Sequence, residues 1–219
     1  DGEKFGLWPG THAWVYREGW LEGFFKALEA NSDWLQMTTF AECLESLPPL
    51  GKVYVPGGSY EEMMEWSGGF FRNFLAKYRE ADTLYKKMLW VSNKVTEATG
   101  TARAASAKRV VDEARQHLYM GQANDAYWHG IFGGLYLRHL RRSVWENLLK
   151  AERLLDRLTQ KHPSLEARWL DWDADGEGEI LLRSESLSLL IDVNQGGQLV
   201  ELSDKESGLN LLDTLTRRP

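Results

Sequence analysis

Three long stretches with apolar side chains at helical spacing limit the folds open to this chain. They cover residues 70–98, 104–122 and 134–160. In the last stretch the apolar stripe consists of Leu137, Leu140, Val144, Leu148 and Leu155. A spacing of three and four residues is typical of helices that bury one face. Three such helices in succession predict a helical bundle.

The pattern changes after Pro163. Residues 179–193 and 197–204 resemble strands, and the pair Gly196-Gly197 between them predicts a hairpin turn. A β region is therefore predicted from about residue 165. Its roughly 55 residues provide only a few strands, fewer than a complete sandwich needs.

The first 60 residues follow a third pattern. A helix is predicted over 12–30, a buried strand at 34–37, a helix near 40–47, a strand at 52–55 and a short helix from 59. Alternating helices and strands are typical of α/β folds, such as the end of a barrel or a doubly wound sheet.

Three helix starts carry capping signals. Thr11 is a predicted N-cap for the first helix. Thr39 with Glu42, and Ser59 with Glu62, have the spacing of a capping box.

Charge and composition exclude several classes of function. The net charge of −6 argues against a general nucleic-acid binder, and no apolar stretch approaches the roughly 18 residues of a membrane span. One cysteine, Cys43, cannot form a disulfide within the chain, and no export signal is visible, so a cytoplasmic location is expected. Ten tryptophans favour a carbohydrate ligand, because flat aromatic faces stack on sugars.

Two segments could carry catalytic or binding chemistry. In "DGEKFGLWPG", Asp1 and Glu3 would share one face of an extended segment, and paired carboxyls are what glycoside cleavage needs. A solvated turn fits the same letters. In "NDAYWHGIFGGLY", residues 124–136 combine polar groups, aromatic rings and glycines, as a pocket wall does. A bundle helix packed through its glycines is the alternative, and His129 alone is more typical of a structural histidine.

A third segment, "DWDADGEGE", has the spacing of a calcium loop. Asp171, Asp173 and Asp175 alternate, and Glu179 is at the ninth position. Leu182 occupies the twelfth position, where an EF-hand needs a bidentate glutamate, and no helices flank the loop. A calcium loop in a β domain and a metal-free acidic hairpin turn both remain open.

Together these segments resemble glycoside hydrolase family 57, in its 4-α-glucanotransferase and α-amylase branch. The resemblance rests on "DGEKFGLWPGTHAWVY", "GGFFRNFLAKYREADTLYKKML" and "NDAYWHGIFGGLYLRHLRRSVWEN", and continues through "DWDADGEGEI" and "GGQLVELSD". It implies a retaining mechanism on α-1,4-glucosidic bonds of an α-glucan or maltooligosaccharide. It also implies that Asp1 is the general acid/base, and that Trp8, Asp125 and Trp128 line the sugar site.

The resemblance also implies a multidomain α + β architecture. Residues 1–69 would be the remnant of an incomplete (β/α)7 barrel, 70–162 a three-helix bundle, and 163–219 the beginning of a β-sandwich. The family's glutamate nucleophile lies on an earlier barrel strand, so we expect this chain to be a C-terminal portion that is inactive alone. No cofactor is expected beyond a structural calcium ion. We expect a homo-oligomer and no nucleic-acid or membrane partner.

Two other classes of function remain open from the sequence. A non-catalytic carbohydrate-binding or scaffold protein would use the same aromatic residues without chemistry. A helical interaction module would explain residues 134–160 but not the polar and aromatic cluster before them.

Overall fold

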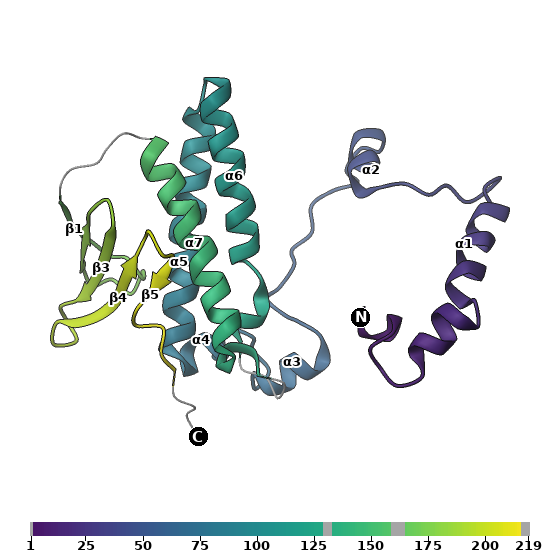
Figure 1. Cartoon of the computed structure of the whole chain (residues 1–219), viewed down its shortest axis with the longest axis horizontal. Coiled ribbons are helices and arrows are strands. Elements are labelled where there is room, and N and C mark those ends of the chain that lie inside the picture. The colour runs from purple at the N-terminus through teal and green to yellow at the C-terminus, as the bar shows by residue number, and fades with distance from the viewer. Residues whose placement is uncertain (1, 129–132, 159–164, 216–219) are drawn as a thin grey trace. The chain divides into compact units, whose positions relative to one another are not determined.

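The computed structural model describes residues 2–128, 133–158 and 165–215, in two compact units that divide at Pro56 and Gly57 (Figure 1). Each unit is described by itself. Within those three ranges no helix combines the length and the apolar composition that crossing a bilayer requires. The expected cytoplasmic location stays a prediction.

The first unit is helical and open. It contains a 3-10 helix at Gly2–Phe5, a π-helix at Ala13–Arg17, and the helices α1 (Trp20–Ala30) and α2 (Phe40–Ser46). Between residues 2 and 56 only Val15 is buried. Most large apolar side chains of this unit are therefore exposed to solvent.

The helix predicted over 12–30 is interrupted. Gly19 adopts a left-handed conformation with φ +76°, which ends the π-helix segment and precedes α1. Thr11 is not the predicted cap, because its hydroxyl donates to the Trp8 carbonyl at 2.6 Å. In α2 the predicted capping box is confirmed. The Glu42 amide donates to Thr39 Oγ1 at 3.2 Å, and the Thr39 amide donates to Glu42 Oε2 at 2.7 Å.

The strands predicted at 34–37 and 52–55 are wrong for the structure in hand. Both segments are irregular or turn-like. A strand needs a neighbouring strand to pair its backbone groups, and residues 2–56 provide none.

The second unit begins with short helices and continues into the bundle. Helix α3 spans Glu61–Trp66 and is preceded by Tyr60 without a side-chain cap, so the predicted Ser59 cap is wrong. Helix α4 (Asn73–Lys77) and helix α5 (Arg79–Thr101) replace the single helix predicted over 70–98, because Tyr78 between them is extended.

Three long helices form the predicted bundle. Helix α6 spans Ala105–Gly121 and helix α7 spans Arg138–Leu158, and both pack against α5 and each other. Their shared core is apolar and contains Leu84, Val91, Val95, Val111, Ala114, Leu118, Val144, Trp145, Leu148, Leu149, Ala151 and Leu155. At Gly121 a Cβ atom would lie 2.6 Å from Leu148 Cδ2, so this glycine permits the close approach of α6 and α7.

The C-terminal strands form one antiparallel sheet in chain order. The strands are β1 (Glu166–Leu170), β2 (Glu179–Arg183), β3 (Leu187–Asp192), β4 (Gln198–Asp204) and β5 (Leu209–Asn210). The predicted turn is confirmed at Gly196 and Gly197, which both have positive φ. The sheet lies beside α5 and α7, with α6 on the far side of the bundle (Figure 1).

The two faces of this sheet have an unusual distribution of polarity. Charged and hydroxyl side chains are buried on one face, including Glu179, Ser188, Asp192, Glu201 and Ser203. The register places apolar side chains on the other face, which remain partly accessible: Ile180, Leu182, Leu189, Ile191, Leu199 and Leu202. Two leucines, Leu181 and Leu190, interrupt the polar face and pack with Trp172.

A buried ionic network joins the polar face of the sheet to the bundle. The Lys87 ammonium on α5 donates to Glu152 Oε2 on α7 at 2.8 Å and to Glu201 Oε1 on β4 at 2.9 Å. Asp156 continues the network by pairing with Lys94, Arg183 and Lys205. Buried charges of this kind are tolerated when they are paired, so the network fixes how the sheet sits on the helices.

Candidate functional site

The expected acid/base, Asp1, lies outside the described residues. Its neighbour Glu3 belongs to the 3-10 helix, so the extended geometry predicted for this carboxyl pair does not hold at Glu3. Trp8 follows this helix, and its amide donates to the Glu3 carbonyl at 3.0 Å. The Trp8 ring is 52% exposed and the Lys4 ammonium lies 5.5 Å from its centroid. This ring is accessible for stacking on a sugar.

Asp125 and Trp128 lie in the connection between α6 and α7, in the second unit. Asp125 belongs to a 3-10 helix, Asn124–Tyr127, and its side chain is exposed. Trp128 is only 7% exposed, and its indole stacks on Trp66 of α3, with ring centroids 6.0 Å apart and an angle of 20°. Residues 129–132 of the predicted pocket motif, which include His129 and Gly130, lie outside the described residues.

Gly134, later in this connection, lies very close to the Trp128 carbonyl. Gly134 has φ +52°, and a Cβ atom there would lie 2.4 Å from the Trp128 carbonyl oxygen. The same carbonyl accepts a hydrogen bond from the Leu135 amide at 2.9 Å. Gly134 thus lets the backbone approach the Trp128 carbonyl more closely than a residue with a side chain could.

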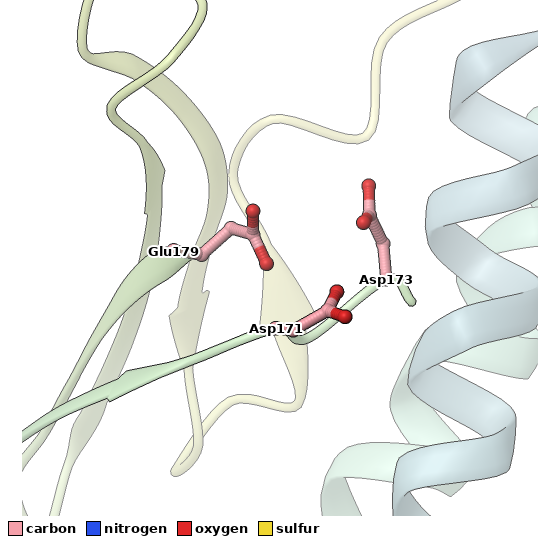
Figure 2. Close-up of side chains that lie close together, drawn as sticks. All are labelled: Asp171, Asp173 and Glu179. Carbon is pink, nitrogen blue, oxygen red and sulfur yellow. The ribbon is translucent and has the colours of Figure 1, made fainter. Parts of the chain in front are cut away.

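The acidic loop between β1 and β2 brings three of the four predicted metal ligands together. One carboxylate oxygen from each of Asp171, Asp173 and Glu179 lies within 4.8 Å of the other two (Figure 2). Asp175 does not join this group. Its carboxylate accepts a hydrogen bond from the Glu177 amide at 2.8 Å, and its amide donates to Asp171 Oδ1 at 3.1 Å.

Two carboxyl groups of this cluster, Asp173 and Glu179, have pKa values above their ordinary range. Burial, the neighbouring Asp175 and Asp171 raise the pKa of Asp173. Burial also raises the pKa of Glu179, with further repulsion from Asp173, although the Trp172 amide donates to Glu179 Oε2 at 2.6 Å. Clustered carboxylates with raised pKa values gain from a cation between them.

The predicted sugar-site residues are distributed over both units. Trp8 belongs to the first, and Asp125 and Trp128 belong to the second. Asp125 and Trp128 both lie in the connection between α6 and α7, and the Trp128 ring stacks on Trp66 of α3.

Comparison with known proteins identifies the family. The family model for the alpha-amylase/4-alpha-glucanotransferase middle domain matches residues 69–155, and the model for the C-terminal domain of the same proteins matches residues 171–219. The chain belongs to the alpha-amylase/4-alpha-glucanotransferase family, glycoside hydrolase family 57.

Relatives in this family match the whole chain. It is 38% identical to alpha-amylase 1 of Dictyoglomus thermophilum and 39% identical to the 4-alpha-glucanotransferase of Thermococcus litoralis. All of the chain aligns, and it spans about a third of each relative, 34% in both cases. The crystal structure of the Thermococcus litoralis 4-alpha-glucanotransferase superposes with a TM-score of 0.66 at 38% identity, over 100% of this chain and 36% of that one.

Two features of the second unit escaped sequence reasoning. Lys87 was not singled out, although it follows the buried Leu84 by three residues and precedes the buried Val91 by four. A lysine in the apolar stripe of a helix is a signal for a buried ion pair. Trp66 was also missed, because no spacing rule connects it with Trp128, 62 positions later in the chain.

Proposed function

We propose that this chain is part of a retaining enzyme acting on α-1,4-glucosidic bonds of an α-glucan or maltooligosaccharide, as a 4-α-glucanotransferase or an α-amylase. The observation that supports it is the similarity of the entire chain to proteins of both names, at 38% and 39% identity. The chain would supply the general acid/base, whereas the nucleophile would come from residues other than these 219.

In the proposed reaction Asp1 acts twice. As a carboxylic acid it gives its proton to the glycosidic oxygen while the nucleophilic carboxylate attacks the anomeric carbon and the carbon–oxygen bond breaks. The resulting Asp1 carboxylate then takes a proton from water or from a sugar hydroxyl. That oxygen attacks the anomeric carbon, releases the nucleophile and completes hydrolysis or transfer.

Three side chains would bind the sugar. The exposed Trp8 ring offers a face for stacking, and the exposed Asp125 carboxylate can accept hydrogen bonds from hydroxyl groups. Trp128 would form a wall of the site rather than a stacking platform, because most of its surface is buried and Trp66 occupies one side of its ring.

We also propose the finer architecture: a barrel remnant at 1–69, the bundle at 70–162 and the beginning of a sandwich at 163–219. The apolar face of the sheet supports the sandwich, because such a face needs a second layer to cover it. The exposed apolar side chains of residues 2–56 support the barrel remnant for the same reason.

A structural calcium ion is proposed at the acidic loop. Asp171, Asp173 and Glu179 would provide carboxylate oxygens, the ligand type that calcium prefers. The ion would hold β1 and β2 together at this end of the sheet and offset the repulsion among the carboxylates. It would take no part in catalysis.

Activity assays on maltooligosaccharides test the function. A full-length parent protein should be active, and Asp1→Asn should lower its kcat by about 10²–10⁴-fold, whereas Asp33→Asn, an exposed control in the same unit, should leave kcat unchanged. The 219 residues alone should be inactive. Full rate in Asp1→Asn, or turnover by the chain alone, would overturn the assignment. Glucan binding by a parent without activity would favour the non-catalytic carbohydrate-binding module.

A further inference from the structure

Trp128 belongs to a small hydrophobic cluster that is separate from the bundle core. Met63, Phe74 and Trp128 are its buried members, with the partly buried Trp66 and Phe71 packed around them. Helix α3 supplies Met63 and Trp66, so a short helix far away in the sequence contributes the surface against which Trp128 rests.

The contact between Trp66 and Trp128 differs in kind from the others in this cluster. The two indoles are nearly parallel, at 20°, whereas Phe71 meets Phe74 edge-on at 85°. A stacked partner restricts the tilt of an indole more than an aliphatic neighbour does, because both flat faces must stay in contact. Trp66 therefore determines the plane of the Trp128 ring.

The polar edge of Trp128 still needs an acceptor. Its Nε1 is buried, and none of the described residues accepts a hydrogen bond from it. Buried N–H groups in folded proteins almost always find an acceptor. In a protein that binds glucans, a sugar hydroxyl oxygen is an acceptor of suitable chemistry.

We propose that Trp66 is a positioning residue for the sugar site, which holds the Trp128 indole so that its Nε1–H donates to a hydroxyl of the bound glucan. The inference rests on the proposed function. Trp66 itself touches no substrate in this arrangement, and it acts through the orientation of Trp128.

Kinetics of the full-length parent on maltooligosaccharides test this role. Trp66→Leu removes the flat face and should raise KM about three- to tenfold with kcat changed less than about twofold, and Trp66→Phe, which keeps an aromatic face, should restore most of the affinity. Phe71→Leu is the matched control, since it loosens the same cluster without touching the stack. Its KM should stay at the wild-type value.

A second measurement follows Trp128 directly. In ¹⁵N-labelled parent protein, the Trp128 indole N–H resonance should shift on titration with maltotriose. The same resonance should also shift in the Trp66→Phe variant. An active parent in which Trp66→Leu leaves KM unchanged, or in which Phe71→Leu raises KM equally, would overturn the positioning role alone. A Trp128 indole resonance that does not shift on addition of maltotriose would also overturn the positioning role. A parent without activity or affinity for maltooligosaccharides would overturn both this inference and the proposed function.

Discussion

The ammonium of Lys87 and the carboxylate of Glu152 form a fully buried ion pair, with Nζ and Oε2 2.8 Å apart. Burial alone would lower the pKa of Lys87, but Glu152 and Glu201 raise it above its ordinary value. Burial likewise opposes ionisation of Glu152, yet Lys87, Lys94 and Arg183 hold its pKa well below the usual range. Both groups are therefore charged at neutral pH.

Replacing Lys87 with methionine should destabilise the chain strongly. The change leaves two buried carboxylates facing each other, and removing one partner of a buried ion pair costs about 3–5 kcal/mol. Lys150→Met is the matched control, because its partner Glu146 lies on the surface and such a pair contributes only about 0.3–0.5 kcal/mol. Urea denaturation followed by circular dichroism measures both. Equal losses in the two variants would contradict the buried network.

The stability difference between wild type and Glu152→Gln should depend on pH. A carboxyl group whose pKa is lowered by folding contributes stability above its unfolded pKa, and that contribution is lost as the pH falls through the folded pKa. The difference should thus be constant from pH 7 down to about 5 and shrink below about pH 4. Urea denaturation at a series of pH values measures it. A difference that grows on acidification would show that Glu152 is not held in its charged form.

Gly134→Ala should disrupt the close approach of residue 134 to the Trp128 carbonyl. A left-handed conformation costs a side chain about 1–2 kcal/mol, and the Cβ atom would also collide with the Trp128 carbonyl. Gly196→Ala separates the two effects, because Gly196 has φ +76° and open space around it. Thermal unfolding should show a larger loss for Gly134→Ala. Similar decreases in the unfolding midpoint of the two variants would mean that the backbone at residue 134 relaxes around the added methyl group.

Calcium should raise the thermal unfolding midpoint, since a ligand that binds only the folded state stabilises it. Asp173→Asn should abolish this response. Without calcium, the same variant should unfold at a higher temperature than wild type at neutral pH, because it removes one of the repelling carboxylates. Glu185→Gln, in the exposed turn before β3, is the control. A midpoint unaffected by calcium would identify the loop as a metal-free acidic turn.

The 219-residue chain should self-associate. Residues 2–56 expose many large apolar side chains, among them Trp34 at 71% and Phe40 at 92%. Exposed surfaces of this kind favour association. Sedimentation velocity measures the oligomeric state, and Trp34→Ser with Phe40→Ser should shift it toward the monomer. A stable monomer at concentrations of about 100 µM would rule out the exposed surface as a contact site.

The sequence predicts some elements well because their signals are local. The α2 capping box depends on two side chains three residues apart, and the hairpin at Gly196 depends on adjacent glycines, so both can be derived from short segments. The long helices α5, α6 and α7 follow from their apolar period. Spacing does not reveal two interruptions, at Tyr78 before α5 and at Gly19 within the helix predicted over 12–30, because both arise from backbone conformation.

Other features depend on partners distant in the sequence. The segments 34–37 and 52–55 have the composition of strands, but a strand forms only where another strand pairs with it. The ion pairs of Lys87 connect residues 65 and 114 positions apart. At the acidic loop the spacing predicted all four carboxylates as ligands, whereas the backbone turn directs Asp175 to an amide of its own loop.

The buried polar face of the sheet has a practical consequence for protein engineering. A cut between α7 and β1 would expose Glu201 and Arg183 on one product. On the other product Lys87 would lose Glu201, and Asp156 would lose Arg183 and Lys205. Chimaeras within this family should therefore exchange residues 57–215 as a single block. Swapping the bundle alone would require every position of the ionic interface to be transplanted with it.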